Sequence, residues 1–332
     1  MTEALLIRLR PSGPWRFGSG GAREQTSAIG HSDTLFGAVT SAMANLGLRD
    51  AWLEATVAAT DPAARLTSLF PYAGKSLFVV PPMTIWPPAA SSRLRWKSAQ
   101  FIPATLAQDL LLGRSLREER WDLDIASRCL IAAGSTAPFK VAMRSAAAVD
   151  SEHAGNLHAH RTACLEFSSN AGLWCAALFS SDLAAEDWMP KLKAAFRFLG
   201  DSGIGGERSL GWGCADGVEF QEGKWPTLLA PELTSVSTVS GYWMLSMFHP
   251  GDEDAVDFSR GFYASADRGG VAQGAVPMVT EGSVIAAAAP PIGAARNVAG
   301  PTSSHPIWRA GFAASIAIPA PGVAAAEEQG IA

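Results

Sequence analysis

The first residues of the chain alternate between apolar and polar positions. Leu5, Ile7 and Leu9 alternate with Leu6, Arg8 and Arg10. Because successive side chains of a strand point to opposite faces, this alternation predicts an opening strand with one more polar face.

A helix is predicted directly after the glycine-rich loop at residues 11–30. Ser32 is a suitable N-cap, Asp33 complements the positive end of the helix dipole, and Gly47 fits the C-terminal stop. A second short helix is predicted at residues 51–59. Three- and four-residue spacing places the apolar side chains of the first helix on one face. These side chains are Leu35, Phe36, Val39, Met43 and Leu46.

The middle of the chain continues this pattern. Residues 161–167 and 173–179 predict a pair of strands with Gly172 in the connection, and a helix at 188–199 follows, with Gly200 at its expected end. Val218 and Phe220 lie beyond the loop after this helix. Strand, helix, two strands, helix, strand is the order of a ferredoxin-like α+β unit. The apolar stripe of this helix consists of Trp188, Leu192, Ala195, Phe196 and Leu199.

The C-terminal third predicts a second, strand-rich unit. We expect an N-terminal domain at residues 1–225, a C-terminal domain at 235–319 and a disordered tail at 320–332, since the tail is acidic and rich in small residues. The fold class expected is therefore α+β with two ferredoxin-like units. The strands expected in the second unit are 242–248, 276–279, 283–287 and 311–318.

Composition restricts the class of protein. The chain has 332 residues, of which 48% are hydrophobic and 17% charged, as in globular proteins. Its four cysteines form no Cys-x-x-Cys pair, so neither a zinc site nor a disulfide framework is expected. The N-terminus does not resemble a signal peptide, and the apolar segment 284–295 is too short to span a bilayer. We expect a soluble cytoplasmic protein without a cofactor or a metal.

Charge is distributed unevenly along the chain. The net charge is −5, yet residues 93–144 contain nine Lys or Arg against five Asp or Glu. Residues 216–257 are acidic, with Lys224 as the one basic residue. This asymmetry fits a subunit that contacts RNA on one side and proteins on the other, and it fits plain solvated surface equally well.

A glycine-rich loop at residues 202–213 is the main candidate for chemistry. Five glycines surround Arg208 and Ser209 directly after a predicted helix. Such a loop can present backbone N–H groups and a guanidinium to a phosphate, and it can equally be a tight helix-to-strand connection with a structural arginine. The helix precedes the glycines and no Gly-Lys-Ser/Thr follows them, which excludes the dinucleotide-binding fingerprint and the P-loop. A nucleic-acid backbone is the phosphate source we expect.

Several segments together resemble a known family. The chain is similar to RAMP proteins of type III CRISPR effector complexes, and among them to the family of subunit four of the type III-A Csm complex. The resemblance covers roughly residues 3–319, and it departs from the family at Asp150, which is followed by Ser151 rather than Arg. The segments that carry it are 31–38 (HSDTLFGA), 69–72 (LFPY), 203–213 (GIGGERSLGWG), 242–246 (YWMLS), 281–284 (EGSV) and 305–311 (HPIWRAG).

This resemblance implies a fold and a role. The two ferredoxin-like units would be RRM-like, and the protein would bind the 5′ handle of the guide RNA in antiviral defence. Its partners would be the guide RNA, the large palm-domain (polymerase/cyclase-like) subunit and a backbone RAMP subunit, with no membrane. The family is not known as a catalyst, so we expect no catalytic residue.

Candidate RNA-binding residues follow from the loop, the basic strip and the start of the first helix. Trp96 and Trp212 are candidates for stacking on bases, with core packing as the favoured role for Trp212. The histidines at 153, 158 and 160 give a weak indication of a metal site, against a solvated hairpin. The candidate RNA-binding residues are His31, Ser32, Arg93, Arg95, Lys97, Arg144, Gly203, Gly205, Gly206, Arg208, Ser209, Gly211 and Gly213.

Two functions from different classes remain. The favoured one is a noncatalytic RNA-binding subunit. The alternative is a metal-independent endoribonuclease that processes repeat RNA, in which His31 or the histidines at 153–160 transfer protons. An unrelated nucleotide-binding enzyme is disfavoured by the order of elements around the glycines.

Overall fold

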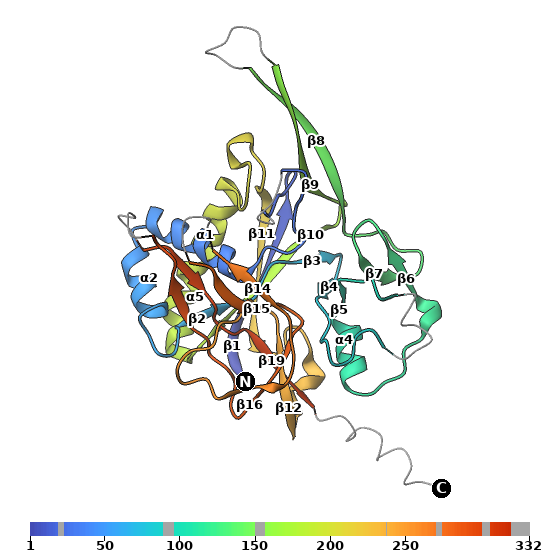
Figure 1. Cartoon of the computed structure of the whole chain (residues 1–332), viewed down its shortest axis with the longest axis vertical. Helices are drawn as coiled ribbons and strands as arrows, with labels where there is room; N and C mark the ends of the chain where they lie inside the picture. Colours follow the sequence, from blue (N-terminus) through green and yellow to red (C-terminus); the bar gives the residue numbers. More distant parts are fainter. Residues whose placement is uncertain are drawn as a thin grey trace.

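The computed structural model describes residues 1–18, 23–88, 96–149, 157–236, 238–269, 274–300 and 306–319. The side chains of 146–149, 157–160 and 235 are outside this description. Figure 1 shows a globular body with a long hairpin projecting from one end. The described segments form a mixed α+β protein with several antiparallel sheets.

The largest sheet has seven strands and is built around β1. Strand β1 pairs with β11 on one side and β10 on the other, and β3, β4 and β5 continue the sheet beyond β10. Leu5, Ile7 and Leu9 are buried while Arg10 is exposed, which confirms the predicted opening strand. The strands are β1 (Thr2–Pro11), β2 (Ala64–Leu66), β3 (Phe70–Ala73), β4 (Ser76–Val79), β5 (Ile102–Pro103), β10 (Ala171–Phe179) and β11 (Ala215–Trp225).

Helices α1 (Ser32–Asn45), α2 (Arg49–Thr56) and α5 (Asp182–Ser202) pack beside this sheet. Helix α1 ends at Leu46 and Gly47, and the φ of Gly47 is +71°, as the predicted stop requires. The predicted cap of α1 was wrong by one residue. His31 occupies the cap position, and Ser32 is the first helical residue.

Helix α5 is longer than predicted at both ends. Ser181 caps its start by accepting a hydrogen bond from the Ala184 N–H at 3.1 Å. Gly200 does not end the helix but lies inside it, where a Cβ would be 3.0 Å from Val218 of β11. The helix ends at Gly203, which has a φ of +81° and donates its N–H to Leu199.

The predicted pairing of the two middle strands was also wrong. Strand β9 (Leu157–Phe167) pairs with β8 (Phe139–Val149) in the projecting hairpin, whereas β10 pairs with β1 and β3. Gly172 lies within β10, where a Cβ would be 2.3 Å from the Leu9 carbonyl oxygen. The glycine therefore allows two strands to approach rather than forming a turn.

A small module, formed by the chain between β4 and β8, lies beside the main sheet on the right of Figure 1. It begins with β4 and β5 and includes the two-stranded sheet of β6 and β7. Its other elements are α4 (Ala104–Leu111), η1 (Glu118–Arg120), β6 (Trp121–Asp124) and β7 (Cys129–Ala132).

The C-terminal half contains a four-stranded sheet in the order β13-β16-β12-β19. Strands were predicted close to these positions, but the described part of this half contains no α-helix, so the two helices of a second ferredoxin-like unit are missing from it. The short helix η3 (Pro231–Ser235) precedes this half. The strands of the C-terminal half are β12 (Val239–Met244), β13 (Val256–Phe262), β14 (Ser265–Arg268), β15 (Val276–Val279), β16 (Val284–Ala287), β17 (Ala295–Asn297), β18 (Trp308–Ala310) and β19 (Ser315–Pro319).

One hydrophobic core extends through both halves. Phe36 of α1 contacts Phe312 with ring centroids 5.7 Å apart. The indole of Trp243 donates to the Val80 carbonyl, and that of Trp225 donates to the Ser315 carbonyl. The proposed boundary between residues 225 and 235 is thus crossed by continuous packing. None of the described helices is long and apolar enough to span a membrane.

Candidate nucleic-acid interface

The glycine-rich loop connects α5 to β11, the two elements that position it. Gly203, Gly205, Gly211 and Gly213 have φ between +77° and +95°, a backbone region that favours glycine. A short helical turn, η2 (Arg208–Leu210), forms the tip of the loop. The sequence therefore forms a compact turn rather than an extended loop.

The base of the loop packs on the segment after β1. The Gly206 N–H donates to the Arg16 carbonyl and the Gly213 N–H donates to the Pro14 carbonyl, both at 2.9 Å. A Cβ on Gly205 would lie 2.3 Å from the Arg16 carbonyl oxygen, and a Cβ on Gly213 would lie 2.1 Å from that of Ile204. These glycines are required by close backbone packing, which is the structural alternative that the sequence left open.

The tip of the loop faces solvent. Arg208, Ser209 and Gly211 are exposed, and Leu210 retains 58% of its accessible surface. The Arg208 guanidinium has no hydrogen bond or ion pair to any described residue. An exposed guanidinium without a carboxylate partner is able to form charge-assisted bonds to a phosphate.

Arg16 lies at the same loop, although sequence reasoning did not select it. Its Nη1 atom is 3.2 Å from the position that a Gly206 Cβ would occupy. Its Nη2 atom has one long contact, 3.5 Å to the Gln25 carbonyl, and its buried Nε atom has no partner among the described residues. Arg16 is 192 positions from Arg208 in the sequence, so only the fold brings these two arginines to one loop.

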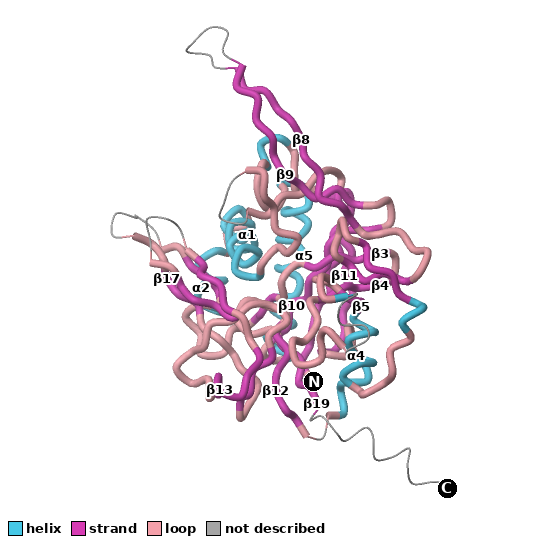
Figure 2. The backbone as a smooth tube through the Cα atoms, turned by 45° about the vertical axis from the view of Figure 1, so that its right-hand side comes forward, coloured by secondary structure: helices cyan, strands magenta, loops and turns pink. Residues whose placement is uncertain are grey.

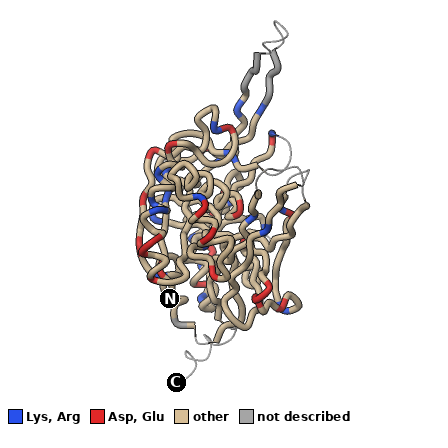
Figure 3. The backbone as a smooth tube through the Cα atoms, turned by 90° about the vertical axis from the view of Figure 1, so that its left-hand side faces the viewer, with Lys and Arg blue, Asp and Glu red and all other residues tan. Residues whose placement is uncertain are grey.

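Arg144 lies on the projecting hairpin, where Figure 3 shows basic positions on both strands near the globular body. Its Nε atom donates to Glu166 on the facing strand at 2.7 Å, and Lys140 lies 3.4 Å from the same carboxylate. Burial opposes ionisation of Glu166, but Arg144 and Lys140 outweigh it and lower the pKa of Glu166. Arg144 already has an anionic partner, and its contact with RNA stays a prediction.

The basic strip before α4 is described only in part. Arg93 and Arg95 lie outside the described residues, and Lys97 is exposed. Trp96 is fully buried, and its ring lies nearly parallel to that of Trp86, with the ring centroids 6.3 Å apart. Trp96 therefore packs in the core, and Trp212 is half-buried beside the glycine loop.

His31 joins the start of α1 to the C-terminal half. Its Nδ1 atom lies 2.9 Å from Glu281 Oε1, and the Ser68 hydroxyl donates to the same oxygen. Burial alone would lower the pKa of His31, but the charge and the hydrogen bond of Glu281 together outweigh it and raise that pKa above its ordinary value of 6.5. Burial would raise the pKa of Glu281, but the charge and hydrogen bond of His31, together with the Ser68 hydrogen bond, outweigh it and lower that pKa. The pair is thus stabilised in its ionised form.

The next two residues of the same motif are also bonded to the protein. Ser32 is buried, donates its N–H to the Ser68 hydroxyl at 2.9 Å and accepts from the Met247 N–H at 3.0 Å. Asp33 is fully buried at its side chain and pairs with Arg268 at 2.9 Å and Arg309 at 3.3 Å. The structure does not test RNA binding by His31 and Ser32, but it gives residues 31–33 a role in joining the two halves.

The remaining histidines do not extend this cluster. His153 is outside the described residues, as are the side chains of His158 and His160. Within the described ranges, no group of three His, Cys, Asp or Glu side chains is arranged to hold a metal.

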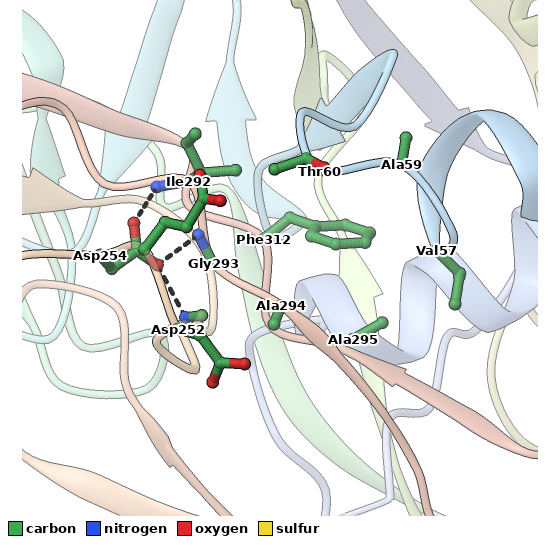
Figure 4. A pocket seen from close by; sticks show the side chains of 12 residues that line it. Val57, Ala59, Thr60, Asp252, Asp254, Ile292, Gly293, Ala294, Ala295 and Phe312 are labelled. Atoms are coloured by element: carbon green, nitrogen blue, oxygen red, sulfur yellow. Dashed lines mark hydrogen bonds between the residues drawn. The ribbon is translucent and has the colours of Figure 1, made fainter.

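A shallow pocket of ≈ 230 Å³ lies between the loop after α2 and the C-terminal half, with Phe312 and Val57 in its wall (Figure 4). The Asp254 carboxylate in this pocket accepts three backbone N–H bonds of 2.7–2.9 Å, so it fastens two loops together. The donors are Gly251, Ile292 and Gly293.

The sequence matches no protein-family model and no curated protein. The structure is similar to solved chains over nearly its whole length. It matches a chain of the "Crystal structure of Csm1-Csm4 cassette in complex with cA4" with a TM-score of 0.60 and 18% identity, covering 96% of this chain and 99% of the other. It matches a chain of the "Crystal structure of Csm3-Csm4 subcomplex in the type III-A CRISPR-Cas interference complex" with a TM-score of 0.65 and 13% identity, covering 95% and 100%.

These matches identify the fold as that of a RAMP subunit of type III CRISPR complexes. More particularly, it is the fold of Csm4, which those structures contain together with Csm1 or Csm3. The resemblance that the sequence motifs indicated is therefore confirmed as a resemblance of fold.

Proposed function

We propose that this chain is a noncatalytic subunit of a type III-A CRISPR effector complex that binds the 5′ handle of the guide RNA. The observation that carries the proposal is the match to Csm4 chains over 95–96% of this chain. Those chains were solved in assemblies with Csm1 and Csm3, which supports the large palm-domain subunit and the backbone RAMP subunit as partners.

We assign the N-terminal half to a ferredoxin-like domain. Its strand order β11-β1-β10-β3, with α1 and α5 as crossovers, is the order 4-1-3-2 of the split βαβ arrangement. The C-terminal half is a reduced second domain, and α1 of the first half contacts β18 of its two-stranded β17–β18 sheet. Both domains are needed for the buried contacts of residues 31–33.

The RNA surface we propose centres on the tip of the glycine loop. Arg208 and Arg16 supply two guanidiniums at one loop, and the packed glycines hold the backbone between them in one conformation. Two guanidiniums at one loop can each form charge-assisted bonds to neighbouring phosphates of a single strand. Lys97, Arg144 and the strip at 93–95 are proposed as further backbone contacts.

The His31 geometry supports the noncatalytic assignment over the endoribonuclease. His31, Ser32 and Asp33 each bond to the C-terminal half, which supports a structural role for His31 in joining the two halves. An endoribonuclease would use the other ring nitrogen, Nε2, as its base, and the RNA cleavage test below decides between the two roles.

The proposal can be tested by purifying the tagged protein from cells that express its CRISPR locus and sequencing the RNA bound to it. We expect guide RNAs that share one repeat-derived 5′ end. The isolated protein should bind repeat RNA and leave it intact. Absence of guide RNA would contradict the proposal, and cleavage that is lost in His31→Ala would establish the endoribonuclease.

A further inference from the structure

Strand β13 lies at the outer edge of the C-terminal sheet (Figure 2), and exposed aromatic side chains gather at its end. Phe262 at its end is 60% exposed, and the adjoining Tyr263 is 45% exposed. Tyr263 is held edge-on against Phe258 with ring centroids 5.1 Å apart. Large aromatic side chains exposed together in this way mark interaction sites, because their burial by a partner is strongly favourable.

The shape of this edge disfavours simple strand addition. The pairing of β13 with β16 shifts register between Asp257 and Phe262. Ser259 within this irregular stretch bonds to the Asp257 carboxylate through both its N–H and its hydroxyl. A bulged edge is a poor template for another strand, including one from a second copy of this chain. A partner would therefore contact the aromatic side chains rather than extend the sheet.

The surrounding charge indicates the chemistry of that partner. Residues 252–267 contain five acidic residues and one basic residue, Arg260, a surplus of four negative charges. Of these acids, Asp252 is fully exposed, with Arg296 at 4.0 Å, and Asp257 is exposed on β13 itself. An RNA backbone would be repelled here, whereas an apolar protein segment flanked by Lys or Arg would be attracted.

We infer that residues Phe258–Tyr263, which comprise most of β13 and the residue after it, form a docking surface for a protein subunit. The segment of that subunit that binds here is apolar and flanked by basic side chains. The seven residues of β13 span roughly 20 Å at about 3.3 Å per residue. This length fits the centre of an interface of standard size, about 800 Å² per partner. The inference rests on the proposed function, since the partner is a protein of the same complex.

The test uses the full-length chain with the large palm-domain subunit and the backbone RAMP subunit of its own locus, each measured by surface plasmon resonance. The variants are Phe262→Ser alone, Phe262→Ser with Tyr263→Ser, and Asp252→Lys. Leu183→Ser is the matched control, because Leu183 is 76% exposed on α5, away from β13. Circular dichroism melts check that each variant folds, and binding of handle RNA is measured in parallel.

We expect the double variant to lose at least tenfold in affinity for one of the two subunits. Asp252→Lys should weaken the same binding and reduce its dependence on salt. Leu183→Ser should leave the subunit affinity unchanged, and all variants should keep the RNA affinity of the wild type. Unchanged subunit affinity in the folded double variant would overturn the inference, and so would loss of RNA binding in place of subunit binding. A wild-type chain that binds RNA but neither subunit would overturn the docking surface alone, and one that binds neither RNA nor subunit would overturn the proposed function as well.

Discussion

At the scale of single residues, the structure separates charged side chains that are already paired from those that are free. Asp33, Glu281 and Arg144 have partners of opposite charge within the protein. Arg208 has none among the described residues, and Arg16 has one long contact to a carbonyl. A free guanidinium gains more from a bound phosphate than a paired one, because no existing bond must be broken.

Arg208→Ala should therefore weaken binding of handle RNA roughly tenfold or more, since a bond to a charged group contributes about 1.5–3 kcal/mol. Arg16→Ala should act in the same direction. Fluorescence anisotropy against salt concentration should show a slope lower by about 0.7 per lost contact. Arg49→Ala is the control, because Arg49 is similarly exposed and bonds to Asp50. Unchanged affinity in Arg208→Ala at moderate salt would refute the proposed surface.

The His31–Glu281 pair should make stability depend on pH. A histidine with a raised pKa stabilises the fold fully below its ordinary value of 6.5, and that stability is lost as pH rises through the raised value. A carboxylate with a lowered pKa stabilises above its ordinary value of 4.5 and loses this as pH falls. Thermal melts should therefore show the largest contribution of this pair between about pH 5 and 6.5, with a decline toward pH 8.

His31→Ala should remove that decline and lower stability by about 3 kcal/mol, because Glu281 is left buried without its partner. His249→Ala serves as the control, since His249 is half-buried and bonds to the Pro277 carbonyl and to Arg296 rather than to a carboxylate. If the melting temperature of the wild type does not change between pH 6.5 and 8, the ionised pair is not formed.

At the scale of elements, the glycine loop shows why similar residues have different roles. Gly211 and Gly213 share a positive φ, of +77° and +80°. A Cβ on Gly211 would meet nothing within 4 Å, whereas one on Gly213 would overlap the backbone of Ile204. Gly211 is needed for its conformation alone, and Gly213 for its conformation and for close packing.

Gly211→Ala should accordingly cost about 1 kcal/mol of stability through backbone strain. Gly213→Ala should cost about 2 kcal/mol more, because the backbone of the loop must shift. Urea unfolding would measure both values, and RNA affinity should fall only in Gly213→Ala. Equal destabilisation by the two variants would show that packing at Gly213 is unimportant.

At the scale of the whole molecule, the two halves depend on each other for burial. Trp243, Leu245 and Ile316 of the C-terminal half belong to the same core cluster as β1 and α1. The ion pairs of Asp33 with Arg268 and Arg309 add buried charge to that contact. Separating the halves would expose apolar surface and leave the Asp33 carboxylate without a partner.

Calorimetry of the full chain should therefore show one cooperative unfolding transition rather than one for each predicted domain. A fragment of residues 1–225 should lack a cooperative transition and aggregate. Two separate transitions in the full chain would mean that the shared core contributes little to stability.

The sequence by itself determined the elements whose signals are local. The alternation at Leu5–Leu9, the apolar stripes of α1 and α5 and the turn at Gly47 were all predicted, because hydrophobic period and glycine conformation act over a few residues. The motif order also indicated the resemblance that the solved structures confirm, although not two complete ferredoxin-like domains.

Tertiary structure decided which distant residues meet. It paired β10 with β1 rather than β9, since central strands are chosen by burial across the whole sheet. It bonded His31, Ser32 and Asp33 to a half of the protein more than two hundred residues away along the chain. It also placed Arg16 beside the glycine loop. Side-chain type and spacing carry no information about such contacts, because the partner of a charge or a hydrogen-bonding group is set by the path of the chain in space.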